Sequence, residues 1–202
     1  MECVVHGWLP SRHDANLARP DPHDPALLLL GQPVDAAAMG LAWNDPSISL
    51  ADLLGKAAGD SATARRVAAM SLRILGNREA LPAFRRMLAD PDEYARKQAA
   101  WGLGVLGSRE DLDVLRPLLG DPARRVRLFA AFALARLGDA DGARLTAEAA
   151  QDTSDEPIRR GEAAIALADG RHRQYRPMLE QLLATGGDRL LVSRLQTALG
   201  RM

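Results

Sequence analysis

The stretch RLFAAFALARLGD, residues 127–139, decides the fold, because its spacing recurs three more times along the chain. The segments RRVAAMSLRILGN and RKQAAWGLGVLGS precede it, beginning at Arg65 and Arg96. A fourth segment, RGEAAIALADGRH, follows it and begins at Arg160. Self-similarity at a nearly fixed period of about 30 residues indicates an array of structural repeats.

Each of the four stretches has the spacing of an amphipathic helix. An Ala-Ala pair follows the leading Arg after three and four residues, and a Leu follows it after seven. Steps of three and four residues place these side chains on one helix face. In three stretches a Gly closes the pattern, and a left-handed Gly is a common helix stop. Upstream, Asp90-Pro91 and Asp121-Pro122 predict an N-cap followed by a proline in the first turn.

A second helix is predicted after each of these stretches, over about residues 79–89, 110–119, 141–151 and 174–184. Pro117 falls late in its segment, so we expect a kink or a shifted helix start there. Two helices for about every 30 residues, with small side chains where helices approach, are typical of an α-solenoid.

The pattern Asp90-Pro91…Arg96-x-x-Ala-Ala-x-x-Leu-x-x-Leu-Gly, repeated from Asp121, resembles the HEAT-repeat family, in particular its short bacterial version described as PBS-lyase HEAT-like. The resemblance implies an all-α, right-handed α-solenoid of antiparallel helix pairs with four to five repeats. It also implies a ladder of hydrogen bonds between repeats, formed by Asp90, Arg96, Asp121 and Arg127. The Asp-to-Arg interval is six only in the two middle repeats, so a ladder that weakens at both ends is expected.

The expected organisation has four parts. Residues 1–33 hold five of the 12 prolines and are predicted to be an extended arm. Residues 34–59 are predicted to form a degenerate capping helical pair. Residues 60–185 form four repeats, and residues 186–202 a capping helix or a truncated fifth repeat. The four repeat boundaries are 60–89, 90–120, 121–151 and 152–185.

Composition narrows the function classes. The formal net charge is zero, which argues against a general nucleic-acid binder. The single cysteine, Cys3, allows no internal disulfide, and no apolar run is long enough to cross a membrane. The start of the sequence lacks the pattern of a signal peptide. We therefore expect a bacterial cytoplasmic protein that binds neither membrane nor nucleic acid.

No motif in the sequence predicts catalysis, a cofactor or a metal. Cys3, His6, His13 and His23 are zinc-type ligands, but their spacing fits no zinc finger, and a chance cluster is the simpler reading. A phosphate loop and a nucleophile elbow are both missing. The acidic residues fall at turns, where capping explains them better than paired catalytic carboxylates.

Two sets of residues are candidates for binding. The residue after each Ala-Ala pair is large and apolar, and it lies about 200° around the helix from the first Ala of that pair, which faces the packing side. The predicted outer face thus collects apolar side chains that either are buried by neighbouring repeats or form a docking surface for the arm, a second copy or another protein. This set, the apolar patch, is Met70, Ile74, Trp101, Val105, Leu128 and Phe132. On the second helices, which are expected to line the concave side, Arg85, Arg86 and Arg116 are candidate contacts.

The favoured function is therefore a non-catalytic protein–protein interaction module, a scaffold or adaptor whose partner is another protein or a second copy of the chain. Two alternatives stay open. One is a lyase-like enzyme or enzyme subunit related to bilin lyases, which the family resemblance suggests without matching functional residues. The other is a nucleic-acid-binding protein that uses the series of arginines as an anion-binding stripe.

Overall fold

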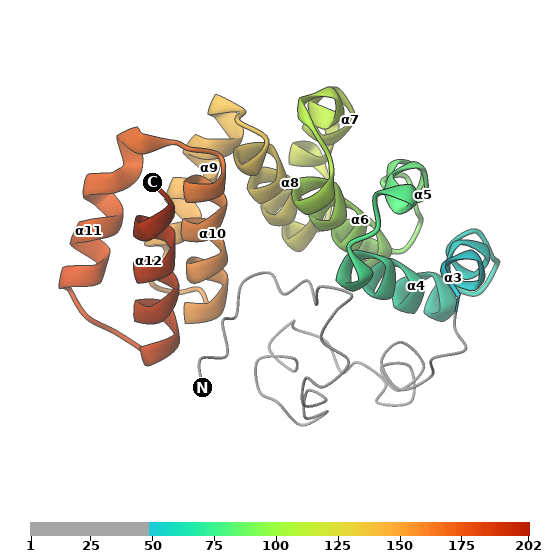
Figure 1. The fold of residues 1–202 in the computed structure, drawn as a ribbon, viewed down its shortest axis with the longest axis horizontal. Coiled ribbons are helices and arrows are strands. Elements are labelled where there is room, and N and C mark those ends of the chain that lie inside the picture. Colours follow the sequence, from blue (N-terminus) through green and yellow to red (C-terminus); the bar gives the residue numbers. More distant parts are fainter. Residues whose placement is uncertain (1–48) are drawn as a thin grey trace.

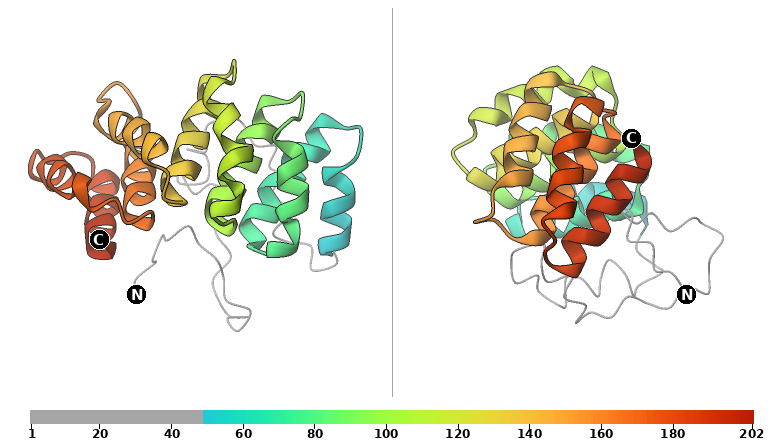
Figure 2. Two further views of the ribbon diagram at one scale, coloured as in Figure 1. Left: turned by 90° about the horizontal axis from the view of Figure 1, so that it is seen from above. Right: turned by 90° about the vertical axis from the view of Figure 1, so that its left-hand side faces the viewer.

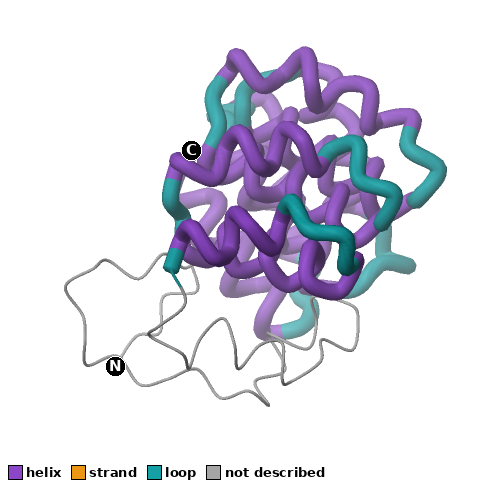
Figure 3. The backbone as a smooth tube through the Cα atoms, turned by 90° about the vertical axis from the view of Figure 1, so that its right-hand side faces the viewer, coloured by secondary structure: helices purple, strands orange, loops and turns teal. Residues whose placement is uncertain are grey.

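The computed structural model describes residues 49–202, and every regular element in that range is helical (Figure 3). Short 3-10 turns precede or continue several of the α-helices. The α-helices are α3 (Leu50–Ala57), α4 (Ala62–Leu75), α5 (Leu81–Met87), α6 (Glu93–Leu106), α7 (Leu112–Leu115), α8 (Arg124–Arg136), α9 (Ala140–Gln151), α10 (Pro157–Asp169), α11 (Arg176–Ala184) and α12 (Arg189–Arg201).

The helices form a curved array of two layers (Figures 1 and 2). Helices α4, α6, α8, α10 and α12 follow one another along the inner side of the arch, and each packs against the next. Helices α5, α7, α9 and α11 lie on the outer side, and α3 packs beside α4 at the N-terminal end. The predicted all-α solenoid is confirmed.

The recurring Ala and Leu side chains are buried between the two helix layers. Ala68, Leu72 and Leu103 are fully buried in one core with Phe84 of the outer helix α5. Gly102 faces the same ring: a Cβ atom at this position would lie 2.7 Å from the Phe84 ring. Small residues in the inner helices therefore let the outer helices approach closely, which is why the spacing repeats.

Helix ends follow the glycine pattern only in part. Gly76 ends α4 with φ 64°, and Gly138 follows α8 with φ 88°, both in the left-handed region. Gly107 ends α6 with an extended backbone, so the left-handed stop expected there is wrong. In the fourth repeat Arg171 stands where the other repeats have this Gly, and it nevertheless adopts φ 58°.

Two local predictions need correction or refinement. Asp90 and Asp121 are not N-caps: α6 is capped by Asp92, and α8 begins after Ala123. Their carboxylates instead accept hydrogen bonds from the backbone N–H two residues on, at 2.9 and 2.8 Å, which shapes the turn before each helix. Pro117 lies in a 3-10 turn, Arg116–Gly120, directly after the single α-helical turn of α7. The second helix of this repeat is therefore irregular at Pro117, where a kink or a shifted start was expected.

The arm predicted for residues 1–33, with its zinc-type residues, lies outside the described residues, and so do residues 34–48 of the cap predicted for residues 34–59. The second half of that cap contains α3. Ser49 caps this helix by accepting a bond from the backbone N–H of Asp52, and the Ser49 N–H donates back to the Asp52 carboxylate. At the other end α12 packs beside α10 and α11. In residues 49–202 no helix is both long and apolar enough to cross a membrane.

Candidate protein-binding face

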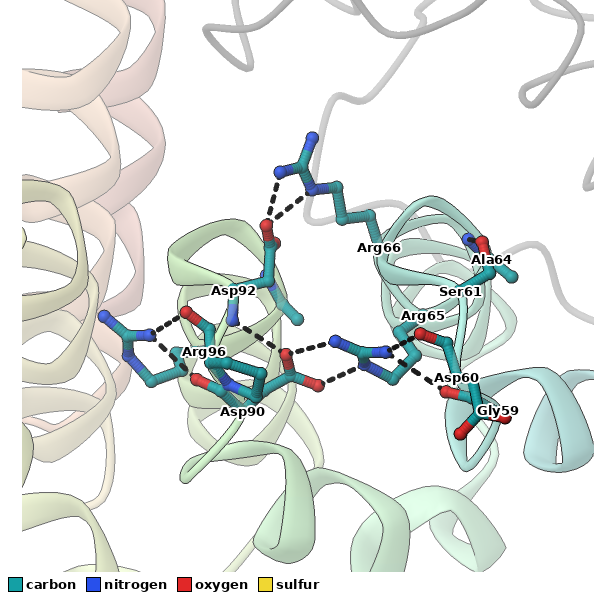
Figure 4. A network of polar contacts seen from close by, with 11 residues as sticks. Gly59, Asp60, Ser61, Ala64, Arg65, Arg66, Asp90, Asp92 and Arg96 are labelled. Carbon is teal, nitrogen blue, oxygen red and sulfur yellow. Dashed lines mark hydrogen bonds and ion pairs between the residues drawn. The ribbon is translucent and has the colours of Figure 1, made fainter.

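Arginines bridge neighbouring repeats near the start of the inner helices (Figure 4). Arg65 of α4 donates through Nε and Nη2 to both oxygens of Asp90, at 2.7 and 3.0 Å. Arg96 of α6 makes the same two bonds to Asp121, at 2.8 and 3.0 Å. All four side chains are largely buried. Charge-assisted, two-pronged bonds of this kind fix the position of one repeat on the next.

The same arginines also hold the turn in front of their own helix. The third guanidinium nitrogen of Arg96 donates to the backbone carbonyls of Asp90 and Pro91, just before α6. Arg127 donates to the carbonyls of Asp121 and Pro122 in the same way. Within residues 49–202 the carboxylate that follows, Asp152, pairs with Arg124 instead. The Arg–Asp bridges therefore include the first repeat, through Arg65 and Asp90, although the sequence predicted a weak ladder there. In the bridge to Asp152, the arginine is Arg124 in place of Arg127.

The expectation that Arg85, Arg86 and Arg116 line the concave side is wrong. Arg85 and Arg86 belong to α5, and Arg116 follows α7, so all three lie in the outer layer (Figure 1). Arg85 pairs with Asp111 at 2.7 Å, and Arg116 pairs with Asp139 at 2.8 Å. These bonds link outer helices to the following repeat.

The apolar patch also differs from its prediction. Met70, Trp101 and Phe132 lie in helices of the inner layer, not on the outside of the arch. They are 1%, 8% and 3% exposed, so they are not open surface residues. The physical reason is the direction of curvature: because the outer layer lies on the convex side, residues turned away from it face the inner side, where neighbouring helices converge. Ile74, Val105 and Leu128 are half-buried.

Aromatic rings of α6 and α8 contact one another in tilted pairs. The Trp101 and Phe129 ring centroids are 4.9 Å apart, and those of Phe129 and Phe132 are 5.5 Å apart. The rings belong to one buried cluster with Ile165 of α10, separate from the cluster that contains Leu103 and Phe84. Trp101 and Leu103 lie about 200° apart on α6. The aromatic row therefore lies on the side of α6 that faces away from α5.

Two cations lie on the faces of these rings. The Arg73 guanidinium is 3.9 Å from the Trp101 ring centroid, and the Lys97 ammonium is 4.1 Å from the Tyr94 ring and 5.5 Å from the Phe129 ring. Such contacts stabilise a cation on an aromatic face. The inner-face cluster, as we call it, consists of Met70, Arg73, Tyr94, Lys97, Trp101, Phe129 and Phe132.

The cluster has an unusual electrostatic environment. Burial, together with the positive charges of Arg125, Arg73 and Arg159, lowers the pKa of Lys97 to about 7. Burial also lowers the pKa of Arg73 to about 10 and raises the pKa of Tyr94. Desolvation favours the neutral form of each of these groups. Perturbed groups gathered on a concave surface mark a candidate binding site.

The cluster adds four residues that the sequence reasoning missed: Arg73, Tyr94, Lys97 and Phe129. A signal for two of them existed. Tyr94, Lys97 and Trp101 are spaced i, i+3 and i+7, which places them on one stripe of α6. Arg73 and Phe129 come from α4 and α8, so their place beside Trp101 depends on how the repeats stack.

The first part of the helical array matches a family model. Residues 50–128 match the family model for HEAT repeats. No curated protein gives a significant match to the sequence. A solved structure of the complex of CpcE and CpcF of phycocyanin lyase from Nostoc sp. PCC7120 is similar, with 16% identity and a TM-score of 0.49, covering 97% of this chain and 98% of that one.

A second solved structure, of an engineered protein, is similar with 20% identity and a TM-score of 0.46, covering 89% of this chain and 87% of that one. At these scores neither structure assigns a function to this chain. The family match coincides with the helices from α3 into α8, where the Arg–Asp bridges join successive repeats. We conclude that residues 50–128 of this all-helical array are similar to HEAT repeats.

Proposed function

We propose that the chain is a protein-interaction module that binds its partner on the inner side of the arch, over the inner-face cluster. One observation carries the proposal: the cluster gathers aromatic rings and cations from three consecutive repeats, through Arg73 on α4, Tyr94 on α6 and Phe129 on α8. Tyr, Trp and Arg are the residue types that dominate the energetics of protein interfaces.

Repeat architecture supports the same proposal. A solenoid presents one extended curved surface, and a partner that contacts several repeats adds up many small contributions. Half-buried residues at the edge of the cluster, Tyr94, Arg73 and Leu128, would make the first contacts. The fully buried rings beneath them would hold these side chains in place, because their rotamers are fixed by packing.

The chemistry of the cluster further favours a polypeptide partner. A cation that lies on an aromatic ring can bind a carboxylate on the side turned away from the ring, while the ring itself contacts an apolar side chain. Such mixed recognition suits a peptide segment that carries both acidic and apolar residues. The proposed module therefore acts as a scaffold or adaptor without chemistry of its own.

Site-specific photo-cross-linking tests the proposal in the full chain. A photoreactive phenylalanine analogue replaces Tyr94 on the inner side in one variant and Val114 in the other. Val114 belongs to α7 of the outer layer and is 41% exposed, so it is the matched control. We expect adducts with one defined protein at position 94 only, and a marked loss of this adduct when Arg73→Glu is added. Equal adducts at both positions, or nucleic acid as the cross-linked species at position 94, would contradict the proposal.

A further inference from the structure

We propose that the first ligand of the inner-face cluster is the chain's own N-terminal segment, residues 1–48, which binds there through its carboxylates. The proposal rests on the proposed function in one respect, because it assigns an occupant to the same surface. It goes further because it assigns residues 1–48 as an intramolecular ligand of the inner-face cluster, which a partner must displace.

Charge complementarity between the two parts of the chain is the first argument. Residues 1–48 contain six acidic and two basic side chains, a net charge of −4. Residues 49–202 contain 24 basic and 20 acidic side chains, a net charge of +4. The zero net charge of the protein therefore conceals an acidic segment joined to a basic repeat array. Opposite net charges favour association of two parts that share one chain.

Basic side chains of neighbouring inner helices act on Lys97 in the cluster. The pKa of Lys97 is lowered by burial and by Arg125, Arg73 and Arg159, which come from α8, α4 and α10. Cations of three inner helices thus act on Lys97 of a fourth, and one of them, Arg159, is also paired with Asp155 and Glu156. Glu93 acts on Lys97 in the opposite direction, as the weakest of these influences. An added carboxylate would offset the mutual repulsion of the cations.

The covalent connection makes such an occupant effective at any protein concentration. Ser49 caps α3, which packs beside α4, the first helix of the inner layer. A chain of 48 residues has a maximum reach of about 160 Å, so the connection imposes no limit on which inner helix it can meet. A tethered ligand also binds at an effective concentration on the order of millimolar, which makes individually weak charge pairs sufficient.

The acidic residues of the segment suit this role. Asp14, Asp21 and Asp24 lie close together in the sequence, and prolines 20, 22 and 25 surround the last two. Proline lowers the entropy that a peptide loses on binding. The segment also carries Trp8 and Trp43, which can contact the apolar residues beside the cations.

The lysine content of the chain provides a direct test. Lys56 and Lys97 are the only lysines in the sequence, and Lys56 lies on α3, much closer along the chain to residue 48. A carbodiimide converts a carboxylate in contact with an amine into an amide, and the reagent leaves as its urea. The full chain is treated at low concentration, cleaved at arginine and analysed by mass spectrometry, without any partner present.

We expect amides between Lys97 and carboxylates of residues 1–48, at a yield well above that of Lys56. Random collisions of a tethered segment would favour Lys56, so this ratio distinguishes binding from proximity. Asp14→Asn, Asp21→Asn and Asp24→Asn together should lower the Lys97 yield several-fold, as should high salt. A matched variant with Asp188→Asn and Asp141→Asn, both remote from residues 1–48 in the sequence, should not.

Three results would overturn the proposal. The first is amide formation by Lys97 with Glu93 or other carboxylates of residues 49–202 only. The second is a yield at Lys56 equal to that at Lys97. The third is cross-links between chains, seen as mixed pairs when chains with and without ¹⁵N are combined, which would assign the surface to a second copy. Because no partner is present, failure here is distinct from failure of partner capture at position 94.

Discussion

Arg96 joins α6 to the next repeat by donating to both carboxylate oxygens of Asp121, at 2.8 and 3.0 Å, while its third nitrogen bonds the backbone carbonyls of Asp90 and Pro91. One side chain thus holds its own turn and the following one. Arg65 repeats this geometry one repeat earlier, with Asp90 as its partner. The bridge is therefore a property of the repeat and not of one site.

Replacing Arg96 by glutamine should destabilise the array. The variant leaves the largely buried Asp121 carboxylate without its cation, and we expect a loss of about 2 kcal/mol in the free energy of unfolding. Arg176→Gln is the matched control, because Arg176 forms an exposed pair with Glu180 and should cost less than about 0.5 kcal/mol. Urea denaturation measures both. Equal, small losses would show that the bridge carries no stability.

The same bridge should also give the protein an acid-sensitive component of stability. Burial raises the pKa of Asp121, but the hydrogen bonds from Arg96 and from the Ala123 N–H outweigh it, and the net pKa is lowered. A lowered carboxylate pKa contributes stability that is present above about pH 4 and lost as the pH falls through the folded-state value. We expect Arg96→Gln to flatten the decline in unfolding free energy below pH 4, measured by urea denaturation between pH 2 and pH 6. A decline as steep as in the parent protein would contradict this origin.

Arg171 offers an opposite test, in which a substitution should stabilise. Its φ of 58° is left-handed, and the three earlier repeats have Gly at this position. Relief of the left-handed strain by Arg171→Gly should raise the free energy of unfolding by about 1 kcal/mol. Gly170→Ala, one residue earlier, should instead destabilise, because its Cβ would clash with the carbonyl oxygen of Ala135. Thermal denaturation of both variants checks the predicted opposite signs, and a lower melting temperature for Arg171→Gly would refute the strain argument.

The sequence predicted the helices and their order well because the spacing of Ala and Leu reflects a contact that every repeat makes. Leu72 and Leu103 occupy the same position in two repeats and are both fully buried. The N-caps were predicted wrongly at Asp90 and Asp121, since an aspartate before a proline suits a turn as well as a cap. A turn at this aspartate and a helix cap at this aspartate differ only in the residue at which the helix begins.

The candidate site could be predicted only in part. The angle around the helix correctly separates Trp101 from Leu103, but it does not say which layer lies on the convex side. That depends on the packing angle between successive repeats, which single-helix periodicity does not contain. The partners of Trp101 come from α4 and α8, so the cluster emerges only when the repeats are stacked. Lys97 is 3% exposed, and because lysine is seldom buried, its burial in the cluster could not be predicted from the sequence.

Close approach of α6 and α8 leads to a further prediction. A Cβ atom at Gly104 would lie 2.6 Å from the Cα of Ala133, so Gly104→Ala should separate the helices and cost about 1–3 kcal/mol. Gly55 of α3 has open space around its Cβ position. Gly55→Ala should therefore stabilise by about 0.5–1 kcal/mol through helix propensity alone. Urea denaturation of the two alanine variants compares them directly; a gain in both would mean that the inner helices adjust freely.

Lys97 should make stability rise with pH between neutral and alkaline conditions. Its folded-state pKa of about 7 lies below the unfolded value of about 10.4, so between these values the unfolded chain binds more protons. The free energy of unfolding must then increase with pH over that window, and the cost of the buried charge is complete below pH 7. Lys97→Met keeps the length and apolar stem of the side chain but removes the charge. We expect it to exceed the parent protein in stability at pH 6 and to match it near pH 10.

The control for this pH dependence is Lys56→Met, which removes the other lysine of the chain and should run parallel to the parent protein from pH 6 to pH 10. Denaturation by guanidinium chloride at intervals of one pH unit gives the three curves. A chain labelled with ¹³C in lysine gives only two side-chain Cε signals, so the midpoint of Lys97 can be read directly by NMR. Parallel curves for all three proteins, or a Lys97 midpoint near 10, would show that the cations of α4, α8 and α10 do not act on Lys97 as described.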